Sequence, residues 1–191
     1  MSTPMESWLP RHRITVDEYY RMADVGLLAQ DARVELIDGE IFDMAPIGSR
    51  HGGIVSRLDH RLIRAIGDRA IARVQQPLRL SRSSEPQPDL AIVRSREDFY
   101  TRSHPTASDV LLVIEVSETT LRYDQRIKAP LYARHGVPEL WIIDLEHLQM
   151  HLLRSPQDET YAEALVITEP GLVTLAADSR LEVDLTGLLK I

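Results

Sequence analysis

The chain contains no cysteine among its 191 residues, which excludes disulfide bonds, thiolate catalysis and zinc sites built from cysteine. Metal ligands therefore have to be carboxylates or histidines, which favour hard ions such as Mg²⁺ or Mn²⁺. No apolar run approaches the roughly 20 residues of a membrane-spanning helix. The segment Met1–Pro10 lacks the basic and then apolar order of a signal peptide. The sequence thus predicts a soluble cytoplasmic protein without a membrane partner.

Lysine is also scarce in this sequence. Of the 22 basic residues, twenty are arginine and only Lys128 and Lys190 are lysine. A surface ion pair can be made equally well by arginine, whereas lysine offers a compact point charge with a tunable pKa. Lys128 lies in the middle of the chain, so we consider it a candidate for chemistry.

The net charge of −7 argues against a strong, non-specific nucleic-acid binder. The charge is nevertheless unevenly distributed. Between Ser49 and Arg82, eight arginines face two acidic residues, so this segment carries about +6 and the rest of the chain about −13. The segment is either a solvated helix face or a surface that contacts phosphates. For the second alternative, the candidate contacts are Arg50, Arg57, Arg61 and Arg64.

Periodic hydrophobic residues predict most of the helices and strands. Thr15 and Glu18 form a capping box at the start of a short helix. We expect strands Arg33–Asp38 and Ile41–Met44 to form a hairpin around Gly39-Glu40. Apolar residues at every fourth position predict a long helix that ends near Gly67, with Ile54, Leu58, Leu62 and Ile66 on one face.

The rest of the chain alternates strands with a helix. We expect strands at 70–75, 78–81, 89–93, 110–116 and 140–144, and a helix over 119–135. Short strand-like pieces such as 149–153 and 163–168 follow His147. This order predicts an α/β fold with a mixed central sheet flanked by helices and an N-terminal hairpin extension. We expect one domain over residues 1–191, with its core at about 15–145 and C-terminal strands in 147–191.

Two acidic residues stand where carboxylates can hold a cation. Asp89 follows Pro88 and opens a strand, and Glu115 is the one charged residue of the apolar strand 110–116. A buried unpaired carboxylate costs several kcal/mol, so Glu115 needs a partner or a metal ion. The alternative is a turn-capping aspartate and a structural ion pair. Lys128 shares one helix face with Asp124 and Tyr132, so it reaches the carboxylates, pairs with Asp124, or does both, with Asp124 orienting the lysine.

These residues carry a resemblance to known nucleases. Pro88-Asp89 and Glu115-Val116-Ser117 resemble the PD-(D/E)XK signature, with serine where that signature has lysine. The stretch 115–124, Lys128, Tyr132, residues 136–139, Trp141 and Asp144 resemble the Uma-two family of restriction endonucleases, as do residues 35–40 and His51. Family members are similar in carrying the lysine on the helix, which points to Lys128 as the replacement for Ser117.

The resemblance implies a restriction-endonuclease-like fold, Mg²⁺ or Mn²⁺ at Asp89 and Glu115, a homodimer and a nucleic-acid substrate, most naturally DNA. We therefore expect a metal-dependent endonuclease with Asp89, Glu115 and Lys128 as catalytic residues. Supporting roles are expected for Glu35, His51 and Asp124, against the alternatives of an exposed hairpin carboxylate and a helix-capping histidine. The rival hypothesis is a catalytically silent nuclease fold that acts as a DNA-binding or interaction module.

Overall fold

A six-stranded mixed sheet forms the centre of the molecule. The structure is a computed structural model and describes residues 11–29 and 31–190; Met1–Pro10, which bear on the signal-peptide expectation, lie outside this part. The strand order is β3-β4-β5-β6-β7-β8, with β5 and β6 parallel and the other neighbours antiparallel. The strands are β3 (Ala70–Val74), β4 (Leu90–Arg94), β5 (Val110–Ser117), β6 (Glu139–Asp144), β7 (Gln149–Gln157) and β8 (Thr160–Ile167). The predicted mixed α/β fold is confirmed.

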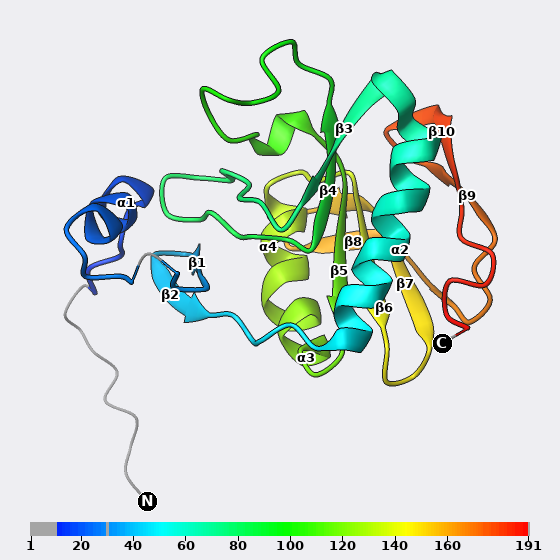
Figure 1. Ribbon diagram of the computed structural model, residues 1–191, viewed down its shortest axis with the longest axis horizontal. Helices are drawn as coiled ribbons and strands as arrows, with labels where there is room; N and C mark the ends of the chain where they lie inside the picture. Colours follow the sequence, from blue (N-terminus) through cyan, green and yellow to red (C-terminus); the bar gives the residue numbers. More distant parts are fainter. Residues whose placement is uncertain (1–10, 30, 191) are drawn as a thin grey trace, which may run out of the picture.

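Helices cover both faces of this sheet (Figure 1). One face carries α2 (Ser49–Ile66), against which the hairpin of β9 (Leu172–Leu175) and β10 (Asp178–Asp184) packs. The opposite face carries α3 (Leu121–Tyr123), the π-helix η3 (Asp124–Lys128) and α4 (Ala129–Arg134). Helix α1 (Val16–Asp24) and the hairpin of β1 (Val34–Ile37) and β2 (Glu40–Asp43) lie at one end. None of the described helices is long and apolar enough to cross a membrane.

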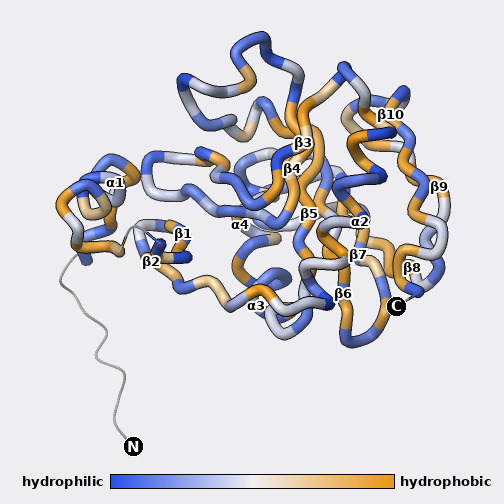
Figure 2. The backbone as a smooth tube through the Cα atoms, viewed as in Figure 1, coloured by the Kyte–Doolittle hydropathy of each residue, from blue (hydrophilic) through white to orange (hydrophobic). Residues whose placement is uncertain are grey.

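Alternation along the strands divides the core into two layers. On β5, Ile114 and Val116 belong to the hydrophobic cluster beneath α2, while Val113 belongs to the cluster beneath α4. Successive side chains of a strand point to opposite faces, so Glu115 faces the α4 side together with Val113. Figure 2 shows the hydrophobic residues gathered along these central strands, with hydrophilic residues in the outer loops. The strand register thus points Glu115 toward the helix that carries Lys128.

The C-terminal segment completes the core on the α2 side. Val183, Leu185 and Leu188 are fully buried in the cluster beneath α2. Arg57 of α2 donates to the backbone carbonyls of Gly187 and Lys190 in this segment. Arg61 donates to those of Asp184 and Thr186. These arginines therefore tie α2 to the backbone of the C-terminal segment.

Two sequence expectations are corrected by the structure. Residues 78–81 form no strand, because the N–H groups of Leu80 and Ser81 donate to the carbonyl of Ser84, which follows them in a tight turn. The expected helix over 119–135 contains the π-helical segment η3. Pro130 explains this interruption: it has no N–H to donate, and in a regular α-helix its ring would clash with the carbonyl four residues earlier.

We expect Leu185→Ala to lower the free energy of unfolding by about 2–5 kcal/mol, because the substitution leaves a cavity at a side chain with 0% exposure. The matched control is Leu172→Ala in β9, where the side chain is 68% exposed and the expected change is within about 0.5 kcal/mol. Urea unfolding of both variants measures the difference. Equal losses would contradict the assignment of the C-terminal segment to the core.

Candidate active site

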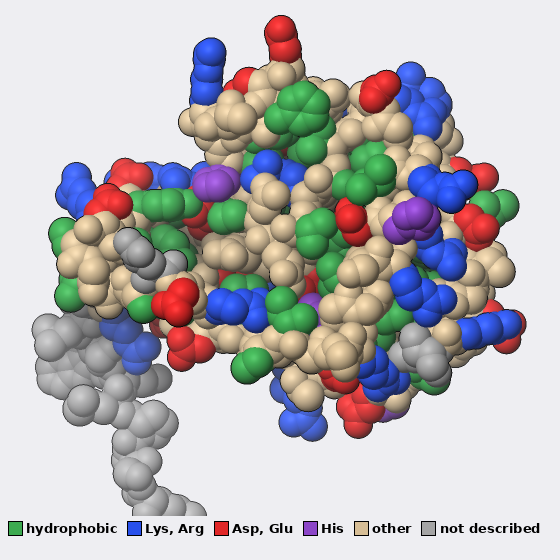
Figure 3. Space-filling model, in the orientation of Figure 1, with side chains coloured by type: hydrophobic (Ala, Val, Ile, Leu, Met, Phe, Trp, Pro, Cys, Tyr) green, Lys and Arg blue, Asp and Glu red, His purple; other side chains and the backbone are tan. Residues whose placement is uncertain are grey.

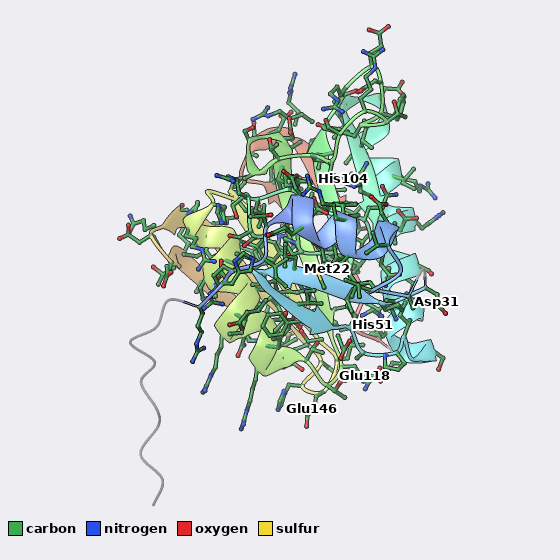
Figure 4. The ribbon with its side chains drawn as sticks, turned by 90° about the vertical axis from the view of Figure 1, so that its left-hand side faces the viewer. Met22, Asp31, His51, His104, Glu118 and Glu146 are labelled. Atoms are coloured by element: carbon green, nitrogen blue, oxygen red, sulfur yellow. The ribbon has the colours of Figure 1, made fainter. Side chains whose placement is uncertain are left out.

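A cavity of about 290 Å³ lies between the β1–β2 hairpin, the start of α2 and the α3–η3 segment. In Figure 4 the side chains of His51 and Glu118, which line it, lie close together below α1. The cavity is lined by all six residues that the sequence singled out for catalysis or its support: Glu35, His51, Asp89, Glu115, Asp124 and Lys128. The structure therefore brings these six residues together around one space.

Strand pairing sets Asp89 beside Glu115. Leu90 pairs with Ile114 in the antiparallel β4–β5 ladder, so the preceding Asp89 lies next to Glu115. The Val116 N–H donates to Asp89 Oδ2 at 2.8 Å, and the Asp89 N–H lies 3.4 Å from Glu115 Oε2. Both side chains are buried. The two carboxylates thus belong to one rigid part of the sheet.

Lys128 reaches this pair from η3 across the sheet face. Its Nζ lies 3.1 Å from Glu115 Oε1 and 3.2 Å from Glu35 Oε2, and the lysine is only 4% exposed. Among the described residues it forms no ion pair with Asp124, so the alternative of an intrahelical pair is wrong. Asp124 instead accepts hydrogen bonds at 2.7 Å from Ser117 Oγ and Thr120 Oγ1.

Ser117 stands where the nuclease signature has lysine, and its contact explains how the site tolerates this change. The serine hydroxyl fixes Asp124, the first residue of η3, and Lys128 is the last residue of the same segment. π-Helical turns are rare and occur frequently at functional sites. The segment that delivers the lysine is therefore anchored to the strand that carries Glu115.

Two tyrosines and a glutamine complete the network, and sequence analysis assigned none of them to the site. Tyr132 is fully buried and donates to Glu115 Oε1 at 2.7 Å. Tyr123 donates to Glu35 Oε1 at 3.1 Å, and the Gln87 N–H donates to Glu35 Oε2 at 3.0 Å. Only Tyr132 had a signal in the sequence, since it shares the helix face of Lys128. The other contacts join segments that are distant in the chain.

Glu35 depends on the tight turn of its hairpin. Asp38 and Gly39 both have positive φ, at 50° and 75°, as a type I′ turn requires. A Cβ at Gly39 would lie 2.6 Å from the Cβ of Arg13, so glycine is needed both for its conformation and for the close approach. The turn fixes the register in which Glu35 points toward Lys128.

His51, in the first turn of α2, contacts the second carboxylate. Its Nε2 lies 3.1 Å from Asp89 Oδ2. The hydrogen bond to Asp89 raises the pKa of His51 despite the opposing effect of burial. Burial would raise the pKa of Asp89, but the His51 hydrogen bond and charge outweigh it and the pKa is lowered. Asp89 is therefore held in its ionised form.

The cavity carries an excess of negative charge. Six carboxylates line it (Glu35, Asp43, Asp89, Glu115, Glu118 and Asp124) against two cations, Arg33 and Lys128, which leaves a formal charge of −4 with His51 neutral. Burial raises the pKa of Glu115 to about 8, although Lys128 opposes this shift. Burial lowers the pKa of Lys128, but the surrounding carboxylates outweigh it and raise that pKa. A further cation would relieve this excess.

The donor set of the cavity fits a hexacoordinate hard ion that keeps much of its water. Among the residues that the structure describes, no group of three or more histidines and carboxylates is arranged to hold a metal ion. Mg²⁺, however, is usually held by one or two carboxylates together with water and substrate phosphates. Glu115 Oε1 is occupied by Lys128 and Tyr132, which leaves Oε2 on the side of Asp89. The carboxylates of Asp89 and Glu115, on neighbouring strands, are therefore the groups in this cavity that would hold such an ion.

The four arginines predicted to contact nucleic acid lie outside the cavity lining. Arg50 donates to the Leu145 carbonyl, and Arg57 and Arg61 bind the C-terminal carbonyls described above. On the face seen in Figure 3, basic and acidic side chains of the described residues are interspersed without a continuous basic surface. Three of these arginines therefore have structural partners, and their contact with nucleic acid stays a prediction.

The fold and the grouping of two strand carboxylates with a helix lysine define the class, a restriction-endonuclease-like α/β protein. The chain belongs to the Uma2 family, described as "Putative restriction endonuclease", whose model matches residues 16–186. It is thus a member of a nuclease family. The crystal structure of a protein from Anabaena variabilis ATCC 29413, titled a putative nuclease belonging to DUF820, has the same fold. Its TM-score is 0.67 at 19% identity, over 93% of this chain and 98% of that one. No curated protein matches the chain.

We expect Lys128→Met to lower the free energy of unfolding by about 3–5 kcal/mol in metal-free buffer, because it leaves Glu35 and Glu115 buried without their cation. Arg126→Met in the same π-helical segment is the matched control, since Arg126 is exposed and should change stability by about 0.5 kcal/mol or less. Chemical unfolding with a chelator present measures both. A loss no larger than that of Arg126→Met would show that the buried ion pairs are not formed.

The raised pKa of Glu115 predicts a pH dependence of stability. Between the ordinary value of 4.5 and about 8, the folded state binds more protons at Glu115 than the unfolded state does. The free energy of unfolding therefore falls as pH rises through this window. In Glu115→Gln this contribution is absent, so the variant should gain stability relative to the wild type between about pH 5 and about pH 8. Urea unfolding across that range, with chelator, tests it; a difference that does not vary with pH would contradict the assignment.

Proposed function

We propose that the protein is a metal-dependent endonuclease that hydrolyses phosphodiester bonds in DNA at the cavity formed around Asp89, Glu115 and Lys128. The observation that carries the proposal is the buried contact of Lys128 with Glu115 beside Asp89. Phosphodiester hydrolysis needs a cation beside the phosphate and positive charge for its transition state. Membership of a nuclease family supports the reaction class.

Each residue would have a distinct part in this reaction. Asp89 and Glu115 would hold Mg²⁺ or Mn²⁺, which when bound supplies a Lewis acid for the phosphoryl group. His51 and the Val116 N–H orient Asp89, and Tyr132 orients Glu115. Lys128 would turn one donor toward the phosphate and stabilise the charge that develops on its oxygens. Glu35 holds the lysine amine at the cavity, and Asp124 anchors the segment that carries it.

The cavity as it stands would repel a phosphodiester. Even with Glu115 protonated and His51 charged, five carboxylates face three cations in its lining, so the carboxylates are only partly compensated. Because a substrate phosphate is itself an anion, binding requires added positive charge within contact distance. This electrostatic mismatch supports a divalent cation as part of the active form.

The rival hypothesis, a nuclease fold without activity, is favoured by one observation. Lys128 already pairs with two of the carboxylates in the described structure, so the site is partly neutralised by the protein itself. A silent module would bind no divalent cation at this cavity. The stabilisation of the protein by Mg²⁺ or Mn²⁺ separates the two hypotheses, because an ion that binds only the folded state raises the melting temperature. The homodimer implied by the resemblance stays a prediction that light scattering would test.

The wild type should cut supercoiled plasmid with Mg²⁺ or Mn²⁺ and not with chelator, and Asp89→Asn and Glu115→Gln should each reduce the rate by about 100-fold or more. Asp43→Asn is the matched control, since Asp43 lines the cavity but is exposed on β2; we expect its rate within a few-fold of the wild type. The metal-dependent rise in melting temperature should vanish in Asp89→Asn. If both variants cut as fast as the wild type, the proposed site is wrong. Absence of both cleavage and metal stabilisation favours the silent module.

A further inference from the structure

A second cavity, of about 660 Å³, lies between α1 and the connection from β4 to β5. It is lined by α1, by Arg79 of the β3–β4 loop, and by residues within 100–106. In Figure 4, His104 of this cavity lies above Met22 of α1, and His51 of the first cavity lies lower in the same view.

Two rings in this second cavity present parallel faces. The rings of Tyr20 and His104 are 21° from parallel, with centroids 6.5 Å apart. The two rings are stacked, and both line the cavity. Tyr20 is 38% exposed. The pair therefore offers flat aromatic surface on which a planar ring can stack.

Guanidinium groups surround these rings. The Cζ of Arg79 lies 5.9 Å from the Tyr20 centroid, and its Nε donates to the buried Glu85 carboxylate at 2.6 Å, which fixes it in place. Arg21 and Arg102 line the cavity and are exposed. Three arginines and two carboxylates, Asp17 and Asp24, thus line this cavity. The first cavity, in contrast, has an excess of carboxylates. Flat rings combined with arginines are typical of single-strand nucleic-acid binding.

The β3–β4 loop connects the two cavities. Arg79 lines the second cavity, while Gln87 and Asp89, on the same loop and its end, line the first. Glu85, which fixes Arg79, precedes Asp89 by four residues, so their Cα atoms are at most about 14 Å apart. A short stretch of one loop therefore links the two cavities.

We propose that the second cavity binds an unpaired nucleobase and its phosphate from the strand whose backbone enters the first cavity. The base stacks on the aromatic surface of Tyr20 and His104, and Arg102 contacts the phosphate. This inference rests on the proposed nuclease function and names its substrate class: single-stranded DNA, or DNA that is locally unpaired beside the scissile bond.

The test measures binding without cleavage. A fluorescent single strand of about twelve nucleotides, and a duplex of the same sequence, are titrated with protein in chelator, with anisotropy as the readout. We expect the single strand to bind more tightly. Tyr20→Leu and His104→Ala should each weaken single-strand binding about tenfold, because one stacking face is lost. Tyr20→Phe keeps the ring but loses the hydrogen bond to Glu85, and should bind like the wild type.

Salt dependence separates the phosphate contact from stacking. Arg102→Ala should reduce the slope of log K against log salt by about 0.7, the value for one phosphate contact on a single strand, whereas His104→Ala should leave it unchanged. Arg180→Ala is the charge-matched control, since Arg180 is exposed on β10 (Figure 1), at the far end from α1. Its binding should equal that of the wild type. Melting temperatures confirm that each variant is folded.

The outcomes distinguish this inference from the nuclease proposal. If the wild type cuts DNA but Tyr20→Leu, His104→Ala and Arg102→Ala bind it normally, the second cavity is not a strand site and the nuclease proposal stands. If the variants lose binding while the wild type never cuts, the strand site stands and the nuclease proposal falls. Competition by thymidine monophosphate as effective as by the oligonucleotide would identify a free-nucleotide site and overturn the inference, as would tighter binding of the duplex.

Discussion

The buried amine of Lys128 is the contact on which the site depends. A charge with 4% exposure is tolerated only when it is paired and hydrogen-bonded. Its partners come from separate parts of the fold: Glu115 from the central strand β5 and Glu35 from the N-terminal hairpin. The ion pairs therefore connect the sheet, the helix layer above it and the hairpin at the end of the molecule. A displacement of any one of them would leave a buried charge without its partner.

This arrangement favours reactivity over stability. Glu115 shares the cavity with five other carboxylates, and its burial raises its pKa to about 8. Replacing such a group by a neutral one of similar shape often stabilises a protein. A ligand that binds in the cavity would balance the excess of negative charge. In the proposed function, a divalent cation provides this balance and allows a phosphate substrate to bind.

The arginines illustrate how a charge pattern acquires different meanings in three dimensions. The sequence contains eight arginines in one segment, but the guanidinium groups of Arg57 and Arg61 donate hydrogen bonds to carbonyls of the C-terminal segment. Arg79 belongs to the same cluster and lies against Tyr20, in the second cavity. One stretch of sequence thus supplies both structural contacts and part of a proposed binding surface, and only the partners tell the two apart.

The hydrophobic pattern alone was sufficient for most of the fold. Apolar residues at every fourth position predicted α2, and the apolar run around Glu115 predicted the central strand, because the buried faces of helices and strands set these patterns. Local chemistry was equally readable: the Thr15–Glu18 capping box and the hairpin before Met44 both formed. The residues 78–81 have strand-like composition, but Leu80 and Ser81 close a local turn at Ser84, and the Arg79 N–H donates to the distant Pro105 carbonyl. Composition could not decide between these, because both states satisfy the backbone.

The acidic pair and the lysine could be chosen from the sequence, since a charged residue inside an apolar strand and a lone mid-chain lysine both need a reason. The residues that surround that lysine could not be identified from the sequence. Glu35, Gln87 and the pair of Tyr123 and Lys128 meet from three segments, and pair distances between segments depend on how the layers pack. Spacing allowed Lys128 to pair with Asp124, and the π-helical turn before Pro130 instead accompanies its contact with Glu115 and Glu35. The sequence thus determined which groups carry charge and which faces are buried, while tertiary packing decided which charges touch.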